Sequence, residues 1–196
     1  KAGLPLMVER FVALAERPGN PLPNPLPQPS LATDEQQRLA TLARLGLQPQ
    51  PCVAALCVGA EYGPAKRWPA PHFAALGKLL REQGWQVWLV GSAKDAEAGA
   101  EAAHLSAGAC LDLCGRTSLN EAVDLLASAS VIVSNDSGLM HVAAALGKPL
   151  IALYGSSSPG FTPPLSQQAH IVSLNLPCSP CFRRECPLGH LDCLTK

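Results

Sequence analysis

The feature that most constrains the fold is a strand, turn, helix and strand unit in the second half of the chain. The apolar run 131–133 predicts a buried strand, and residues 149–154 predict a second one. Between them, residues 135–148 are Asn-Asp-Ser-Gly-Leu-Met-His-Val-Ala-Ala-Ala-Leu-Gly-Lys, a polar turn followed by a helix. Two strands joined in this way form a parallel crossover. The chain is therefore predicted to contain a parallel β-sheet.

The polar turn of this unit, Asp136-Ser137-Gly138, is a candidate anion-binding site. It falls where the strand ends and the helix begins, so several backbone N–H groups lack an intrahelical partner and the helix dipole is positive. Such groups stabilise a phosphate, and Gly138 lets a ligand approach the backbone closely. The same residues also suit an ordinary N-cap, in which Asp136 or Ser137 accepts a bond from the first turn. His141 is either a packed helical histidine or part of the site.

Length and composition limit the class of protein. The 196 residues fit one domain, or one domain with an appendage, and 47% hydrophobic content is enough for a core. Fifteen basic residues balance fifteen acidic ones, so no charge pattern for nucleic acid or an anionic membrane is visible. No apolar run approaches the ~20 residues that span a bilayer. The first residues include no Met and lack a signal-peptide layout, which suggests a piece of a longer protein.

Composition divides the chain into an inter-domain region with two helices, an α/β domain and a cysteine-rich tail, over residues 1–50, 51–176 and 177–196. In the first region, apolar residues at helical spacing predict a helix over 4–17. Six prolines within 18–29 then force an extended connection. A second helix is expected from Thr33 or Asp34 to about Leu45.

From Pro51 onward, strand-like and helix-like runs alternate. The expected strands are the short apolar runs 53–58, 86–90, 111–113, 131–134, 150–153 and 171–174. The expected helices are 70–83, 94–104, 118–129 and 138–147. This alternation predicts a doubly wound parallel α/β sheet, in which ligands bind beyond the carboxyl ends of the strands.

Further loops converge on that edge of the sheet. The first, residues 59–69, contains Lys66 and Arg67, which can neutralise and grip a phosphate or form a solvated surface pair. The second, residues 91–97, contains Asp95 and Glu97. These acids either bind ribose hydroxyls or complement a helix dipole without any ligand.

The combination of a basic loop, an acidic loop and a helix N-terminus predicts a nucleotide diphosphate site. The serine-rich segment 155–159 adds hydroxyl groups near the same edge. Neither a Walker A loop nor a Gly-x-Gly-x-x-Gly fingerprint is present in the sequence, which counts against an ATPase or a nicotinamide dehydrogenase.

Four of the eight cysteines lie within the last 19 residues. With His190, they give five candidate ligands at metal-like spacing, namely Cys178, Cys181, Cys186, His190 and Cys193. Four of the five would make a tetrahedral zinc site, and an iron–sulfur cluster fits less well. The alternatives are a disulfide-linked loop or a simply reduced one. A zinc-dependent interaction module is thus one reading of the chain, although zero net charge and 5% aromatic residues weigh against nucleic acid as its partner.

Three motifs together resemble the ADP-heptose:lipopolysaccharide heptosyltransferases. They are Gly-Ala-Glu-Tyr-Gly-Pro-Ala-Lys-Arg-Trp-Pro at 59–69, Gly-Ser-Ala-Lys-Asp at 91–95 and Asn-Asp-Ser-Gly-Leu-Met-His-Val-Ala-Ala-Ala at 135–145. The resemblance covers most of residues 51–176. It implies a GT-B glycosyltransferase, which has two Rossmann-like domains, and places this chain in the C-terminal half that holds the nucleotide sugar. Another GT-B nucleotide-sugar transferase is the alternative.

The resemblance also implies roles for single residues. Lys66 would contact phosphate, while Ser137 and Gly138 would present a hydroxyl and a backbone N–H to the diphosphate. Asp136 and His141 would lie near the sugar or the phosphates. Asp95, with Glu97 as the second choice, would bind ribose.

The reaction implied is an inverting transfer of heptose from ADP-heptose to the first heptose of the lipopolysaccharide inner core, with no essential cofactor or metal. The acceptor and the general base would belong to an N-terminal domain that these residues do not include, so the chain alone is expected to bind donor without turnover. The location implied is cytoplasmic, at most peripheral to the inner membrane.

Overall fold

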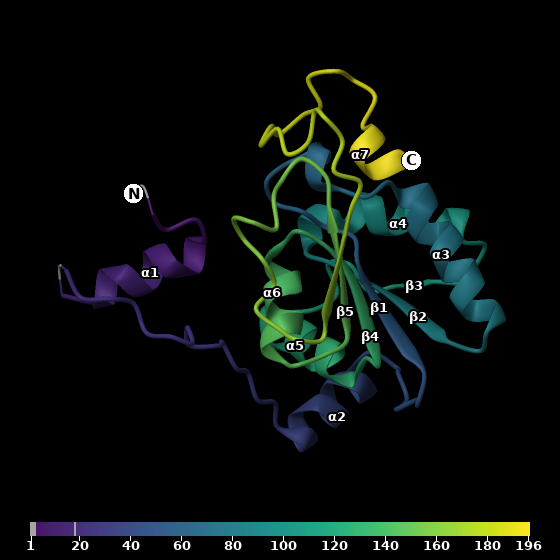
Figure 1. The fold of residues 1–196 in the computed structure, drawn as a ribbon. Helices are drawn as coiled ribbons and strands as arrows, with labels where there is room; N and C mark the ends of the chain where they lie inside the picture. Colours follow the sequence, from purple (N-terminus) through teal and green to yellow (C-terminus); the bar gives the residue numbers. More distant parts are fainter. Residues whose placement is uncertain (1–2, 18) are drawn as a thin grey trace.

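The computed structural model of the chain describes residues 3–17 and 19–196 (Figure 1). Residues 1, 2 and 18, which fall in the predicted 1–50 region, lie outside the described residues. Within the described part, the centre is a six-stranded parallel sheet of order β3-β2-β1-β4-β5-β6. Its strands are β1 (Val53–Cys57), β2 (Gln86–Val90), β3 (Leu111–Asp112), β4 (Val131–Asn135), β5 (Leu150–Tyr154) and β6 (Ala169–Ser173). The predicted doubly wound α/β fold is confirmed.

The central strand β1 explains why these segments are continuous apolar runs. All five of its residues are buried, because helices cover both faces of the sheet. Leu56 pairs with Leu89 of β2 on one side and with Val133 of β4 on the other. Successive side chains point to opposite faces, so Ala55 and Leu56 belong to two separate core clusters.

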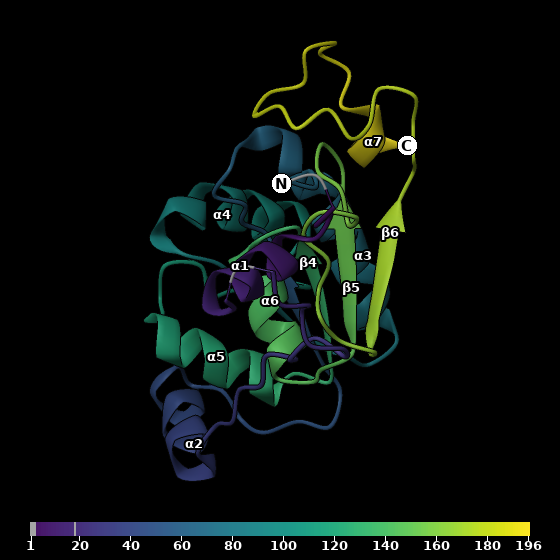
Figure 2. The ribbon, with the colours of Figure 1, turned by 60° about the vertical axis from the view of Figure 1, so that its left-hand side comes forward.

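The helices form one layer on each face of the sheet (Figures 1 and 2). One layer contains α3 (Ala70–Glu82) and α4 (Ala96–Leu105), and the other contains α2 (Glu35–Arg44), α5 (Leu119–Ser128) and α6 (Gly138–Ala145). Phe73 and Ala102 fill the first core, and Leu42, Leu125 and Met140 fill the second. Two short 3₁₀ turns, η1 (Pro64–Lys66) and η2 (Ala93–Asp95), follow β1 and β2.

The two ends of the chain lie outside these layers. Helix α1 (Met7–Ala15) stands apart from the sheet in Figure 1 and contains no buried residue. The cysteine-rich tail, residues 177–196, lies beyond the carboxyl end of β6 and holds the short helix α7 (Asp192–Thr195), which the sequence did not predict (Figure 2). Among the described residues, no helix is both long and apolar enough to cross a lipid bilayer.

Candidate functional site

The site lies at the topological switch point of the sheet, where β1 has β2 on one side and β4 on the other. Connections from these strands diverge there and leave a crevice at their carboxyl ends, the usual ligand position in such sheets. A cavity of about 470 Å³ opens at this point. It is lined by the loops after β1 and β2 and by the beginnings of α5 and α6, including Gly59, Asp95, Leu119, Ser137, Gly138 and Val142.

Asn135, the last residue of β4, holds the loop after β1 in place. Its side chain is fully buried. The amide nitrogen donates to the carbonyl oxygens of Val58 and Gly59 at 3.0 and 3.3 Å, and the amide oxygen accepts from Trp68 N–H at 2.9 Å. The buried amide is therefore satisfied by both ends of this loop. The sequence argument missed this residue, although an Asn that closes an apolar strand is a signal that could have found it.

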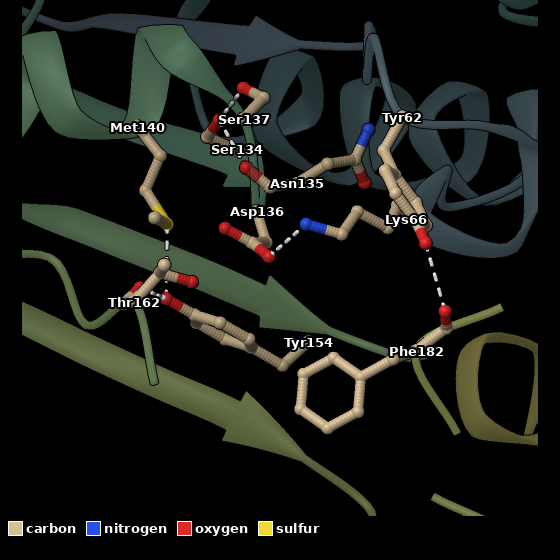
Figure 3. Close-up of polar contacts among 10 residues, drawn as sticks. All are labelled: Tyr62, Lys66, Ser134, Asn135, Asp136, Ser137, Met140, Tyr154, Thr162 and Phe182. Atoms are coloured by element: carbon tan, nitrogen blue, oxygen red, sulfur yellow. Dashed lines mark hydrogen bonds and ion pairs between the residues drawn. The ribbon is translucent and has the colours of Figure 1, made fainter. Parts of the chain in front are cut away.

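Lys66 and Asp136 form an ion pair beside the cavity. The Lys66 ammonium lies 2.5 Å from Asp136 Oδ2, and Asp136 is only 6% exposed (Figure 3). The two residues come from η1 and from the end of β4, 70 positions apart in the sequence. The fold thus brings together two of the predicted site residues and places a lysine cation next to the start of α6.

The start of α6 is not capped by a side chain. Ser137 occupies the N-cap position without such a bond, and Asp136 points to Lys66 instead. The ordinary N-cap interpretation of this turn is therefore wrong within the described residues. At Gly138, no atom lies within 4 Å of the position that a Cβ would take. The first-turn N–H groups thus have no side-chain partner in the described residues, and the space next to Gly138 is open.

Asp95 lines the same cavity, on the side of β2. Its carboxylate accepts hydrogen bonds from the backbone N–H and the hydroxyl of Ser92 at 2.9 and 2.7 Å. A Cβ added at Gly59 would collide with this carboxylate, so the glycine allows the two loops to approach. Glu97 is exposed and is not among the residues that line the cavity.

Arg67 and His141 lie away from this cavity. Arg67 donates through Nε to the carbonyl oxygen of Ala60 at 3.2 Å and lines a separate cavity beside α4. His141 lines an apolar cavity with Phe161 and α1. Desolvation lowers the pKa of His141, the Lys66 charge lowers it further, and the Asp136 carboxylate opposes both. The lowered pKa favours the neutral imidazole, and the cation that contacts Asp136 is Lys66.

The tail cysteines come together without forming a closed metal site. The thiols of Cys178, Cys181, Cys186 and Cys193 are free, and with His190 they line a cavity of about 20 Å³. In the part of the chain that the structure describes, no three His, Cys, Asp or Glu side chains are arranged to hold a metal ion. His190 Nδ1 instead accepts a hydrogen bond from Asp192 N–H at 2.9 Å. The predicted zinc site is not confirmed, and the disulfide alternative is wrong for these thiols.

Comparison with known proteins identifies the class to which this fold and site belong. The family model of glycosyltransferase family 9 (heptosyltransferase) matches residues 1–192. The chain therefore belongs to this family of heptosyltransferases.

One related sequence and two solved structures show how similar this chain is to known proteins. Lipopolysaccharide heptosyltransferase 2 of Escherichia coli K12 is 50% identical over 183 residues, which are 89% of this chain and 53% of that protein. The structure of E. coli ADP-heptose lps heptosyltransferase II aligns with a TM-score of 0.80 at 49% identity, covering 87% of this chain and 54% of that one. E. coli heptosyltransferase WaaC with ADP aligns with a TM-score of 0.57 at 26% identity, covering 76% and 45%. The chain thus spans about half the length of these relatives.

Proposed function

We propose that this chain binds the ADP-heptose donor of an inverting heptosyltransferase that builds the lipopolysaccharide inner core. The observation that carries the proposal is the uncapped start of α6 beside the Lys66–Asp136 pair, at the switch point of the sheet. N–H groups at a helix start, together with a cation, favour a diphosphate. The related WaaC structure contains ADP, which supports a nucleotide diphosphate as the class of ligand.

The cavity suggests how the donor lies. The diphosphate contacts the N–H groups of Ser137 and Gly138 and the Lys66 ammonium. The ribose faces Asp95, whose second carboxylate oxygen is not taken up by Ser92 in the bonds described above. The adenine lies against the apolar wall that includes Leu119, whose side chain is exposed.

In the proposed reaction, a hydroxyl of the acceptor heptose displaces ADP at the anomeric carbon of the donor. Negative charge then grows on the leaving diphosphate. Lys66 and the α6 amides stabilise that charge because they are held in position before the reaction begins. The general base and the acceptor site belong to another domain of the enzyme, so residues 3–17 and 19–196 bind donor and do not turn it over. In this proposal, the heptose transfer takes place on the cytoplasmic side of the inner membrane.

The three predicted regions have separate roles in this proposal. Residues 1–50 connect the two domains, residues 51–176 bind the nucleotide sugar, and residues 177–196 support the binding domain. We also propose that the tail takes up a structural zinc ion, for which the described side chains would have to move closer together, because four thiols that line one cavity are a ligand set that zinc prefers. Backbone N–H groups near Cys186, first that of Leu191, lower the pKa of its thiol and favour the thiolate.

Zinc is tested by metal analysis of protein purified without added metal. We expect about one zinc ion per chain in the wild type and its loss in Cys181→Ser. The matched control is Cys52→Ser, which removes an exposed thiol far from the tail in sequence. Absence of zinc, together with four tail thiols that react freely with a thiol reagent, would contradict the proposal.

The donor proposal is tested by calorimetric titration with ADP, UDP and GDP. We expect ADP to bind most tightly and Lys66→Ala to weaken its binding at least about tenfold, since a charge-assisted contact to phosphate is lost. Lys94→Ala is the matched control, because this lysine forms an exposed pair with Glu61. Equal affinity for the three nucleotides, or equal effects of the two substitutions, would argue against the assignment.

A further inference from the structure

The cysteine-rich tail is bonded directly to the turn that carries Lys66. Phe182 N–H donates to the Ser156 carbonyl at 2.7 Å, and Ser156 N–H donates to the Ala65 carbonyl at 3.3 Å. Ala65 N–H donates in turn to the Arg184 carbonyl at 2.9 Å. These backbone bonds connect the tail, the end of β5 and η1 in one closed series. Ala65, the residue before Lys66, is therefore fixed from two sides.

Side chains strengthen the same junction. Tyr62 donates from its hydroxyl to the Phe182 carbonyl at 2.9 Å (Figure 3). The centroid of its ring lies 5.3 Å from Lys66 Nζ and 5.1 Å from the Arg184 guanidinium carbon, so the ring has a cation near it from each segment. At Gly63, a Cβ would lie 2.6 Å from the Arg184 carbonyl oxygen, so the absence of a side chain lets the tail approach.

This junction bears on the donor site through Lys66 and through its loop, because Glu61, next to Tyr62, lines the 470 Å³ cavity. None of the residues that line the 470 Å³ cavity comes from the tail, as far as the described residues go. A lysine side chain has a long flexible stem, and holding it in one place before a ligand arrives reduces the entropy lost on binding. The tail holds both the backbone next to Lys66 and the Tyr62 ring near the Lys66 ammonium.

We propose that the tail is a brace that positions Lys66 for the donor diphosphate, with Tyr62 and Arg184 as positioning residues. The inference rests on the proposed phosphate role of Lys66. Tyr62 and Arg184 touch no donor atom in this arrangement and act through the lysine and its loop.

The test is a double-mutant cycle on the full chain, with ADP affinity measured by calorimetry. Arg184→Ala is expected to weaken ADP binding about three- to tenfold, and Arg184→Lys to restore most of it, because lysine keeps the cation over the Tyr62 ring. In a Lys66→Ala background, Arg184→Ala should cause little further loss, because the group that it positions is already gone. Arg183→Ala is the matched control, since it removes the same charge one residue earlier, and it should bind ADP as the wild type does.

Additive losses from Lys66→Ala and Arg184→Ala, or equal losses from Arg183→Ala and Arg184→Ala, would overturn the brace while leaving the donor site intact. Failure of the wild type to bind ADP would overturn the donor proposal and the brace with it. Thermal melting of each variant checks that the fold survives, and Tyr62→Phe, which removes only the hydroxyl bond to Phe182, gives a second and milder probe expected to act in the same direction.

Discussion

Lys66 and Asp136 form a largely buried ion pair. A carboxylate at a helix start is favoured by the dipole, and a lysine at 2.5 Å neutralises it. Asp136 therefore keeps Lys66 beside the first turn of α6. The contribution of the pair to stability and its proposed role in ligand binding can be separated by measurement.

Asp136→Asn should lower the free energy of unfolding by about 1–3 kcal/mol, because it leaves the Lys66 ammonium without its partner in a largely buried position. Urea denaturation gives this change as a lower midpoint at constant slope. Glu61→Gln serves as the control, since the Glu61–Lys94 pair is exposed, and it should leave the midpoint in place. Equal midpoints for both variants would mean that burial of the Asp136 pair contributes nothing.

At the scale of the elements, the helix starts differ in how their N–H groups are satisfied. Helix α5 has a complete capping box, in which Ser118 accepts from Glu121 N–H and the Glu121 carboxylate accepts from Ser118 N–H at 2.8 Å. Helix α6 has none in the described structure. The capped start of α5 therefore contributes to stability, and the uncapped start of α6 is a candidate ligand-binding site. Each helix start gives a prediction.

Ser118→Ala should destabilise the protein by about 1 kcal/mol, the usual cost of a lost N-cap. The Ser118 backbone and hydroxyl bonds, and then Arg44, lower the pKa of Glu121 from 4.5. Because this folded-state pKa lies below the unfolded value, the ionised carboxylate stabilises the fold above about pH 4.5, and that contribution is lost as the pH falls through the lowered value. The melting temperature, measured from pH 7 to pH 3, should therefore fall less steeply with decreasing pH in Ser118→Ala than in the wild type. The same fall in melting temperature between pH 7 and pH 3 in both proteins would contradict the role of the capping box.

Gly138→Ala should separate binding from stability. The position has room for a methyl group, so melting temperature should stay the same or rise slightly. The methyl group would occupy space beside the first-turn N–H groups, and ADP affinity should fall about tenfold. Unchanged affinity in a stable Gly138→Ala protein would place the diphosphate elsewhere.

At the scale of the whole molecule, the sequence predicted the elements that are buried on both faces and missed features that depend on the tail and on side-chain direction. Strand β2 was predicted residue for residue, since helices cover it on both sides. Strand β6 was predicted to begin two residues late and to end one residue late, because it is an edge strand with exposed residues such as Ile171. Helix α7 was missed, since four residues carry no periodic pattern.

The same distinction applies to the candidate site. The meeting of Lys66 and Asp136 agrees with the prediction that the loops after parallel strands converge on one edge of the sheet, and the observed strand order places β1 next to β4. The side-chain directions of Arg67 and His141 did not follow, because neighbouring residues on a turn or a helix point to different cavities. The roles of Lys66, Asp95, Ser137 and Gly138 toward a donor stay predictions.

The central claim is that the start of α6 binds the diphosphate, and backbone amide shifts report on it most directly. We would record ¹H–¹⁵N spectra of the full chain during titration with ADP and, separately, with adenosine. If the diphosphate binds at the start of α6, ADP should cause the largest shifts at the amides of Ser137, Gly138 and Leu139. Adenosine, which has the base and the ribose but no phosphate, should shift only amides near Leu119 and near Asp95. Equal patterns for the two ligands, or ADP shifts that leave residues 137–139 unmoved, would contradict it.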